Sequence, residues 1–453
     1  MTFKPFHQNQ NLLLPPSFAD FLGESHEAVI LAEFMAELNT AALEQSYHNT
    51  NGGSSAYHPV MLLSVLVYAY MNSIFSSRQI AKKLRQDLAF MYLAGSQTPD
   101  FRTLARFRKD KGSMLESVFV QVVHKAKDLG LVGFGTCSLD GTKIYANASK
   151  DKNTSLSGQI ADLLKQADTT DALEDELYGN EANGVPAKLK TKAGRQQKKQ
   201  QKTKAERVNT TDPDSKLMQM KRKDYAQAFN VQTITENGFV LSNSIFNTSA
   251  DQGTLLGSLE QFKALHSDTP DKLLADKGYS SEDNYSFCEQ NQIDAYIPIY
   301  KPGTDLSGYI YHPATDTYTD KRGRIYRFKQ RMEKKDGISG KRGRPSQAVT
   351  VTTQKKLHRQ FKHIVYLYQN TRTKAKKFLS ISPGWQKYMR QQMKKLSTLK
   401  GRLLYRKRMT DVEGVFANIK HNLNFTRFRL RGFYGVATEW NLISLAHNLK
   451  KLL

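Results

Sequence analysis

Cysteine is nearly absent from this 453-residue chain, which has only Cys137 and Cys288. No CxxC pair occurs, which argues against a cysteine zinc site, and two cysteines are too few for a disulfide framework. We expect Cys137 to be a small buried strand residue and Cys288 a helix residue. Both fit a reducing compartment.

Long hydrophobic runs are also absent. The longest, from Val60 to Met71, contains a serine and is too short to span a bilayer. The N-terminal sequence Met-Thr-Phe-Lys-Pro lacks the charged and then apolar pattern of a signal peptide. We therefore expect a cytoplasmic protein without a membrane partner, and the length predicts two or three domains.

Acidic residues are few compared with basic ones. Lys and Arg number 67 and Asp and Glu 42, which gives a formal net charge of +25. Such an excess favours nucleic acid as the partner, because Lys and Arg neutralise phosphates and release counterions. A basic enzyme acting on another substrate remains the alternative. The aromatic content of 10% argues against global disorder.

Three acids are candidates for chemistry in this basic background. Asp140 closes the apolar run 137–139, where we expect the tip of a strand, and Asp276 follows the apolar residues 273–275. Glu413 lies beside a helical apolar stripe made of Val412, Val415, Phe416, Ile419 and Leu423. Mg²⁺ prefers carboxylate oxygen, and two such ions promote in-line phosphoryl displacement. The three acids therefore indicate metal-dependent phosphodiester chemistry.

Each acid has a structural alternative. Asp140 precedes Gly-Thr and Asp276 precedes Lys-Gly, so either can simply begin a turn. The run from Thr410 to Glu413 matches a capping box, in which Glu413 would only help to start a helix. These alternatives remain open at the level of the sequence.

The first 130 residues predict a helical domain. Apolar residues recur at helical spacing from residue 58 to 129, and Ser76 and Gln79 match a capping box. A further helix opens at residues 99–100 and is basic through Arg102, Arg106, Arg108, Lys109 and Lys111. Short helices with a basic last member favour a helix-turn-helix-like DNA-binding module. A bundle that only packs on the rest of the protein is the alternative.

Residues 131–149 and 223–300 predict an α/β core. Two alternating runs flank Asn237-Gly238, a strong hairpin signal, and helices and strands then alternate up to residue 299. An antiparallel hairpin followed by alternating helix and strand is the order of a ribonuclease H-like mixed sheet with flanking helices. We expect C-terminal helices within residues 401–453 to complete this catalytic core.

Two further segments interrupt the core. Residues 150–222 combine an acidic patch with a lysine-rich run, which predicts a charged helical insertion or linker. Residues 301–400 are basic and β-leaning, which predicts an insertion domain. Within it, Arg342 and Arg344 flank a glycine, and such a core can enter a narrow minor groove. An exposed basic turn is the alternative for this segment.

These motifs together resemble the DDE transposases of bacterial insertion sequences, over roughly residues 50 to 453. The first acid lies in 138–144, followed by 146–149, and the second in 274–279. Segments 57–59 and 99–108 are similar to the N-terminal domain of that family, and 212–215 and 229–232 to its core. The third stretch contains Arg408, Glu413, Phe416, Lys420, Phe428, Arg431 and the tail 446–449.

The resemblance implies that Asp140, Asp276 and Glu413 bind two Mg²⁺ or Mn²⁺ ions. The family has Tyr, Arg, Glu and Lys in order around its third acid, and Tyr405, Arg408, Glu413 and Lys420 match. Here four residues separate Arg408 from Glu413, so on an ideal helix Arg406 shares the face of Glu413 instead. The residues expected to contact DNA are Lys143, Arg408, Lys420, Arg427, Arg431, Arg342, Arg344 and Arg106.

The resemblance further implies an enzyme that cuts double-stranded DNA at the ends of its own mobile element and joins the 3′ ends to target DNA. A homodimer on DNA in the bacterial cytoplasm, associated with the nucleoid, is expected, because two ends are processed together. Two alternatives remain. One is a ribonuclease H-like nuclease that never joins strands, and the other is a non-catalytic DNA-binding protein derived from a transposase.

Overall fold

The computed structural model describes residues 17–47, 55–155, 207–221, 223–300, 306–333 and 362–453. Much of the predicted charged insertion lies outside these residues, as do Arg342 and Arg344. The chain divides into two compact units. The first comprises Met1–Val132, Ala417–Phe425 and Ala437–Leu453, and the second Gly133–Phe416 and Thr426–Val436. We expected residues 401–453 to complete the catalytic core, but Ala417–Phe425 and Ala437–Leu453 belong to the first unit.

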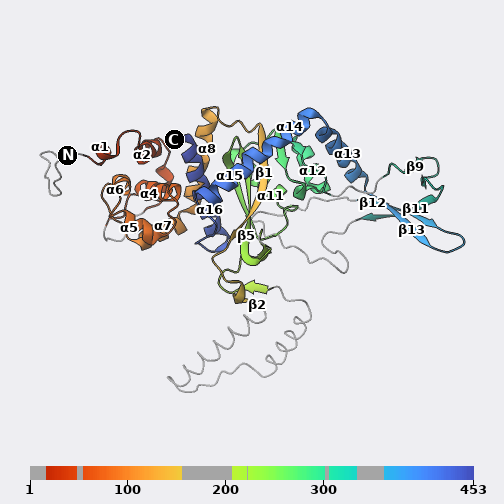
Figure 1. Cartoon of the computed structure of the whole chain (residues 1–453), viewed down its shortest axis with the longest axis horizontal. Helices are drawn as coiled ribbons and strands as arrows, with labels where there is room; N and C mark the ends of the chain where they lie inside the picture. The colour runs from red at the N-terminus through yellow and green to blue at the C-terminus, as the bar shows by residue number, and fades with distance from the viewer. Residues whose placement is uncertain (1–16, 48–54, 156–206, 222, 301–305, 334–361) are drawn as a thin grey trace, which may run out of the picture. The chain divides into compact units, whose positions relative to one another are not determined.

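The first unit is helical, as predicted for residues 1–130 (Figure 1). Its helices before residue 132 are α1 (Phe18–Leu22), α2 (Glu27–Ala36), α3 (Ala41–Gln45), α4 (Pro59–Met71), α5 (Ser77–Lys83), α6 (Leu88–Leu93), α7 (Phe101–Asp110) and α8 (Gly112–Asp128). The long apolar run forms α4, which is buried along nearly its whole length. It therefore serves as the core helix of this unit.

Capping side chains at the helix N-termini agree only in part with the sequence patterns. Asp100 caps α7, and its Oδ1 accepts a hydrogen bond from the Thr103 N–H at 2.7 Å. Ser76 precedes α5 as predicted, but its hydroxyl makes no capping hydrogen bond, and Gln79 is exposed. The predicted capping box is therefore wrong, although the helix begins at the predicted residue.

The second unit is built on a mixed sheet. Its main strands are β1 (Thr136–Tyr145), β5 (Tyr225–Glu236), β6 (Phe239–Phe246), β7 (Lys272–Ala275) and β8 (Asp294–Tyr296). They run in the order β6-β5-β1-β7-β8, in which β1, β7 and β8 are parallel and β5 is antiparallel to β1 and β6. β4 (Lys216–Gln219) pairs with the start of β5. Residues 153–155 and 207–209, within the segment predicted as a charged helical insertion or linker, pair as the small strands β2 and β3.

The predicted hairpin between β5 and β6 is confirmed. Asn237 and Gly238 both have positive φ, 51° and 77°, as a two-residue type I′ turn requires. Helices α11 (Leu255–His266) and α12 (Glu282–Gln290) follow β6 and β7. Cys137 is buried in β1 and Cys288 in α12, so both cysteine predictions are confirmed.

The predicted β-rich insertion follows β8. It is an antiparallel sheet of β9 (Tyr309–His312), β10 (Thr317–Asp320), β11 (Ile325–Glu333), β12 (Lys362–Gln369) and β13 (Lys376–Ile381). Tyr326, Tyr366, Leu379 and Ile381 form its own small core. The sheet therefore has a small core of its own that mixes aromatic and aliphatic side chains.

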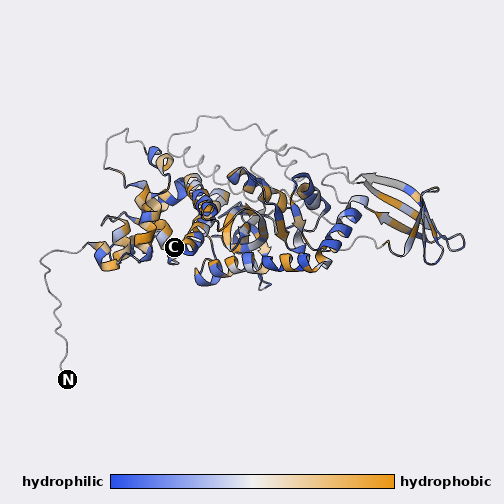
Figure 2. Ribbon diagram, turned by 90° about the horizontal axis from the view of Figure 1, so that it is seen from above, coloured by the Kyte–Doolittle hydropathy of each residue, from blue (hydrophilic) through white to orange (hydrophobic). Residues whose placement is uncertain are grey.

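The C-terminal part is helical. α13 (Pro383–Ser397) is followed by α14 (Leu399–Arg408), a π-helical segment η3 (Met409–Glu413), α15 (Gly414–Ala417), a second π-helical segment η4 (Asn418–Asn422) and α16 (Gly432–Leu452). Both polar and apolar residues, blue and orange in Figure 2, occur along the described ribbon. Within the described ranges, no helix has the length and apolar character needed to cross a membrane.

Candidate active site

Asp140 lies in the middle of β1 rather than at its tip. β1 pairs with antiparallel β5 along most of its length, so the strand continues through Gly141. The predicted strand end and the alternative turn at Asp140 are both wrong, because the long partner β5 keeps β1 extended. On its other side β1 meets the shorter β7, which ends at Ala275 opposite Leu139.

Asp276 is the first residue after β7 and caps a 3₁₀ turn, Lys277–Tyr279. Its Oδ1 accepts a hydrogen bond from the Lys277 N–H at 2.6 Å, so the turn alternative is correct for the backbone here. Because Leu139 and Ala275 are partners in parallel register, the acids that follow them lie on the same face of adjacent strands. The prediction that Asp140 and Asp276 come from neighbouring parallel strands is confirmed.

Glu413 lies inside a continuous helical run, from α14 through η4, rather than at a helix start. Thr410 is also inside this run, and its hydroxyl donates to the Lys407 carbonyl at 2.8 Å. The alternative capping box from Thr410 to Glu413 is therefore wrong, since such a box requires a helix N-terminus. The segment η3 contacts β1 and β5, and α14 contacts β7.

The π-helical turn decides which arginine faces Glu413. A π-helix bonds i to i+5, so residues five apart come into line where an α-helix would rotate them apart. Arg408 Nη2 lies 3.5 Å from Glu413 Oε1, and Arg408 Nη1 lies 3.0 Å from Asp140 Oδ2. Arg408 therefore faces Glu413, where ideal α-helical spacing would have placed Arg406, and it bridges two of the three acids.

The electrostatics of this site favour a cation. Burial raises the pKa of the Asp140 carboxyl, and the nearby charge of Asp276 acts in the same direction. The Arg408 guanidinium acts in the opposite direction, as does the Gly141 N–H, which donates to Asp140 Oδ1 at 2.8 Å. Ionising the Asp140 carboxyl therefore costs free energy unless a positive charge lies beside it.

Two family matches cover the ends of the chain. Residues 16–110 match the family described as "Transposase domain (DUF772)", and residues 366–453 match the "Transposase DDE domain". Both matches are to transposase domains, and together they support a DDE transposase of insertion sequences. The second match includes Arg408 and Glu413 but not Asp140 or Asp276. Comparison with curated proteins gives no match.

The three candidate acids would suit a hard divalent cation. Asp140, Asp276 and Glu413 offer only carboxylate oxygen, the ligand type that Mg²⁺ and Mn²⁺ prefer. Within the described ranges, no three His, Cys, Asp or Glu side chains are grouped closely enough to hold a metal ion. The Arg408 guanidinium instead bridges Asp140 and Glu413. The residue types therefore fit a metal, and Arg408 supplies the local positive charge.

The other predicted DNA contacts are dispersed. Lys143 is three residues from Asp140 on β1, so it lies on the opposite face, and its Nζ donates to the Gln219 carbonyl at 2.8 Å. Arg427 and Arg431 are exposed and donate to the carbonyls of Ala146 and Asn147, just after β1. Arg106 (exposed) and Lys420 (half-exposed) belong to the helical unit. Arg408 is the member of this group with ion pairs to Asp140 and Glu413 among the described residues.

Four residues near the acids were not selected from the sequence. They are Gln232, Asp251, Tyr279 and Asp411. Asp411 is buried, and the Ser138 hydroxyl donates to it at 3.4 Å. Gln232 had a usable signal, because a glutamine in the middle of a buried strand needs a hydrogen-bond partner. Asp251 and Tyr279 had no comparable local signal.

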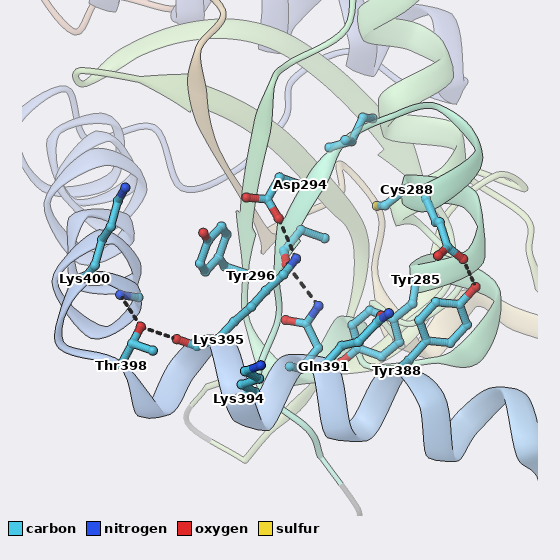
Figure 3. A pocket seen from close by; sticks show the side chains of 15 residues that line it. Tyr285, Cys288, Asp294, Tyr296, Tyr388, Gln391, Lys394, Lys395, Thr398 and Lys400 are labelled. Carbon is cyan, nitrogen blue, oxygen red and sulfur yellow. Dashed lines mark hydrogen bonds and ion pairs between the residues drawn. The ribbon is translucent and has the colours of Figure 1, made fainter.

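A separate cavity lies beside the edge strand β8. Its volume is about 520 Å³, and α12, β8 and α13 contribute most of its lining (Figure 3). Lys395 Nζ contacts Asp294 Oδ1 at 2.5 Å and lies 5.3 Å from the centre of the Tyr296 ring. None of the three candidate acids lines this cavity. It is therefore not the site of the proposed metal chemistry.

Proposed function

We propose that this transposase cleaves DNA at the ends of its own insertion sequence and joins the 3′ ends to target DNA. The observation that carries the proposal is the pairing of β1 with β7, which sets Asp140 beside Asp276, together with the Arg408–Glu413 segment that contacts these strands. The strand order β6-β5-β1-β7-β8, with β5 antiparallel, supports a ribonuclease H-like core.

In this proposal Asp140, Asp276 and Glu413 hold two Mg²⁺ or Mn²⁺ ions. The ions supply Lewis-acid stabilisation of the phosphoryl oxygens and lower the pKa of bound water. The residues themselves have simpler roles. β1 and β7 fix the separation of Asp140 and Asp276, and the π turn holds Glu413 in line with Arg408. Arg408 then orients two carboxylates and is available to a phosphate.

The DNA partner follows from charge. The net charge of +25 favours a polyanion, and exposed Arg427 and Arg431 lie beside the end of β1. We include Lys420, Lys143 and Arg106 as phosphate contacts, and Arg342 and Arg344 as contacts outside the described residues. A homodimer on DNA, in the bacterial cytoplasm and close to the nucleoid, completes the proposal, since two ends are processed together.

The test is an end-cleavage and joining assay. Purified protein with Mg²⁺ should nick DNA carrying the ends of its element and leave 3′-hydroxyls, and a pre-cut end should yield joined product. Glu413→Gln should abolish both reactions, whereas Glu260→Gln, a neutralised exposed acid on α11, should leave both intact. Cleavage without joining would favour a nuclease. Absence of metal-dependent cleavage would favour a non-catalytic DNA-binding protein, and normal cleavage by Glu413→Gln would remove Glu413 from the site.

The helical unit should contribute separately to DNA affinity. Arg106→Ala removes one exposed guanidinium from α7, so the slope of log affinity against log salt should decrease in magnitude by about 1. Lys125→Ala is the matched control, because Lys125 already pairs with Glu37 at 2.7 Å. Fluorescence anisotropy with end DNA at several salt concentrations measures both slopes. Equal slopes for Arg106→Ala and wild type would exclude Arg106 from the interface.

A further inference from the structure

A polar network lies on the face of β1 opposite the side chain of Asp140. It consists of Asn230 and Gln232 on β5, Asp251 before α11, and Tyr279 after β7. Asn230 Nδ2 donates to Asp251 Oδ1 at 2.8 Å, and Gln232 Nε2 donates to the same oxygen at 3.0 Å. Gln232 is fully buried, so these bonds satisfy a group that would otherwise be costly to bury.

The network reaches the segment that carries Asp276. Tyr279 ends the 3₁₀ turn that Asp276 caps, and its N–H donates to the Asp276 carbonyl at 3.0 Å. Its hydroxyl donates to Gln232 Oε1. Burial raises the pKa of Tyr279, and the charges of Asp251 and Asp140 act in the same direction. Asn284 Nδ2 also donates to the Tyr279 carbonyl, at 2.6 Å.

The glycines that follow the two acids leave room for this network. A Cβ at Gly141 would lie 2.2 Å from Gln232 Nε2 and 2.9 Å from Asp251 Oδ1. A Cβ at Gly278 would lie 3.8 Å from Asp251 Oδ2. Asp251 therefore packs against the backbone immediately after Asp140 and close behind Asp276. Gly141 has no positive φ in this strand, so the need for glycine there is one of space.

We propose that Asp251, acting through Gln232 and Tyr279, is a positioning residue that fixes the backbones of Asp140 and Asp276 at the separation needed for metal binding. This inference rests on the proposed function, because it assumes that these two acids bind the same metal ions. Asp251 touches neither acid side chain in this arrangement. It holds the two strand segments together from behind, as hydrogen-bonded outer groups commonly do at metal sites.

Two other roles for Asp251 make different predictions. If the network only satisfies buried Gln232, its loss lowers stability without changing metal affinity. If Asp251 binds the metal directly, its charge is essential. Asp251→Asn separates these roles, because one amide oxygen can still accept the two bonds that Oδ1 now accepts, whereas the charge is lost. Asp251→Ala removes both.

The experiment measures Mn²⁺ binding to the full-length protein by titration calorimetry, with thermal unfolding in the absence of metal. Asp251→Ala and Gly141→Ala should weaken Mn²⁺ binding by about 10- to 100-fold, as outer-group substitutions do. Asp251→Asn should stay within a few-fold of wild type. Gly253→Ala is the matched control, because nothing lies within 4 Å of a Cβ at that exposed position two residues away.

Wild-type Mn²⁺ affinity in both Asp251→Ala and Gly141→Ala would overturn the proposal, as would an Asp251→Asn variant that loses as much affinity as Asp251→Ala. Should Asp251→Ala fail to fold, Gly141→Ala and Asp251→Asn still test the positioning role, because both keep a hydrogen-bonding side chain at position 251. A protein in which Asp251→Ala and Gly141→Ala weaken Mn²⁺ binding as expected, but which never cuts end DNA, would refute the proposed function and leave the positioning role standing. Normal cleavage by the wild-type protein, with Mn²⁺ affinity unaltered in Asp251→Ala and Gly141→Ala, would support the proposed function and refute the positioning role.

Discussion

Asp140→Asn should lower the rate of Mg²⁺-dependent end cleavage by on the order of 10³-fold or more, with little change in DNA binding. The metal ions are proposed to supply several kcal/mol of charge stabilisation in the transition state, and each 1.4 kcal/mol is a factor of ten in rate. Asparagine keeps the size of the side chain but removes the charge that attracts the metal. It also weakens the 3.0 Å ion pair with Arg408.

Stability measurements make this result interpretable. The folded pKa of Asp140 is raised above its unfolded value of about 3.9, so ionising this carboxyl costs stability, and the cost grows as the pH rises above that value. Asp140→Asn should therefore gain stability relative to wild type between acidic and neutral pH. The gain should be modest, because the side chain is 24% exposed and Arg408 loses its partner.

Single-turnover cleavage of labelled end DNA measures the effect of Asp140→Asn, and Glu260→Gln controls for loss of an acid elsewhere in the same unit. A cleavage rate within tenfold of wild type would show that Asp140 does not hold the metal. Loss of DNA binding in parallel with cleavage would instead indicate a damaged interface. The proposed chemistry requires Asp140→Asn to lose cleavage while it keeps DNA binding.

The relation between Asp140 and Asp276 could be predicted from the sequence because each acid follows a short apolar run. Such runs form buried strands, and the helix that follows the second strand pattern favours parallel neighbours. The length of β1 could not be predicted in the same way. The Asp-Gly pair is a turn signal locally, and the pairing of β1 with β5, which includes Gly141 opposite Gln232, keeps the strand extended. Tertiary pairing therefore overrode local propensity.

The position of Arg408 shows a different limit. Spacing on an ideal helix selected Arg406, because nothing in the local sequence announces a π turn between Arg408 and Glu413. Such turns are higher in energy than α-helix and occur where tertiary contacts or a functional site hold them. Here Asp411, which lies within the π-helical segment, is buried and accepts a hydrogen bond from Ser138 of β1. This contact helps to fix the turn.

Arg108 was expected to make α7 basic, but it is buried. Its side chain is 5% exposed, and its Nη1 donates to the Tyr70 hydroxyl at 3.0 Å and to the Phe75 carbonyl at 2.9 Å. Glu439 on α16 lies 3.6 Å from the same nitrogen and is fully buried. The charge of Arg108 therefore interacts with buried groups inside the helical unit. It does not add to an exposed basic surface on α7, as its sequence had suggested.

Glu439→Gln should lower the free energy of unfolding by about 3–5 kcal/mol, because it leaves the Arg108 cation buried without its counter-charge. Tyr70 donates to Glu439 Oε1 at 3.2 Å, and its pKa is raised by burial, so the phenol is not expected to ionise and replace the lost carboxylate. Urea denaturation in a Trp385→Phe background measures the effect. Trp440, the remaining tryptophan, is fully buried in the same unit as Glu439.

The double variant Arg108→Met, Glu439→Leu tests whether the cost of Glu439→Gln comes from an unpaired charge. Replacing both partners by apolar groups removes the ionic group that needs compensation, so the double variant should be more stable than Glu439→Gln alone. Glu37→Gln is the control for an exposed pair, and it should change the midpoint little because solvent screens Lys125 and Glu37. A double variant no more stable than Glu439→Gln would mean that the contribution of Glu439 is packing or hydrogen bonding rather than charge, since only the burial of an unpaired guanidinium is relieved by removing Arg108.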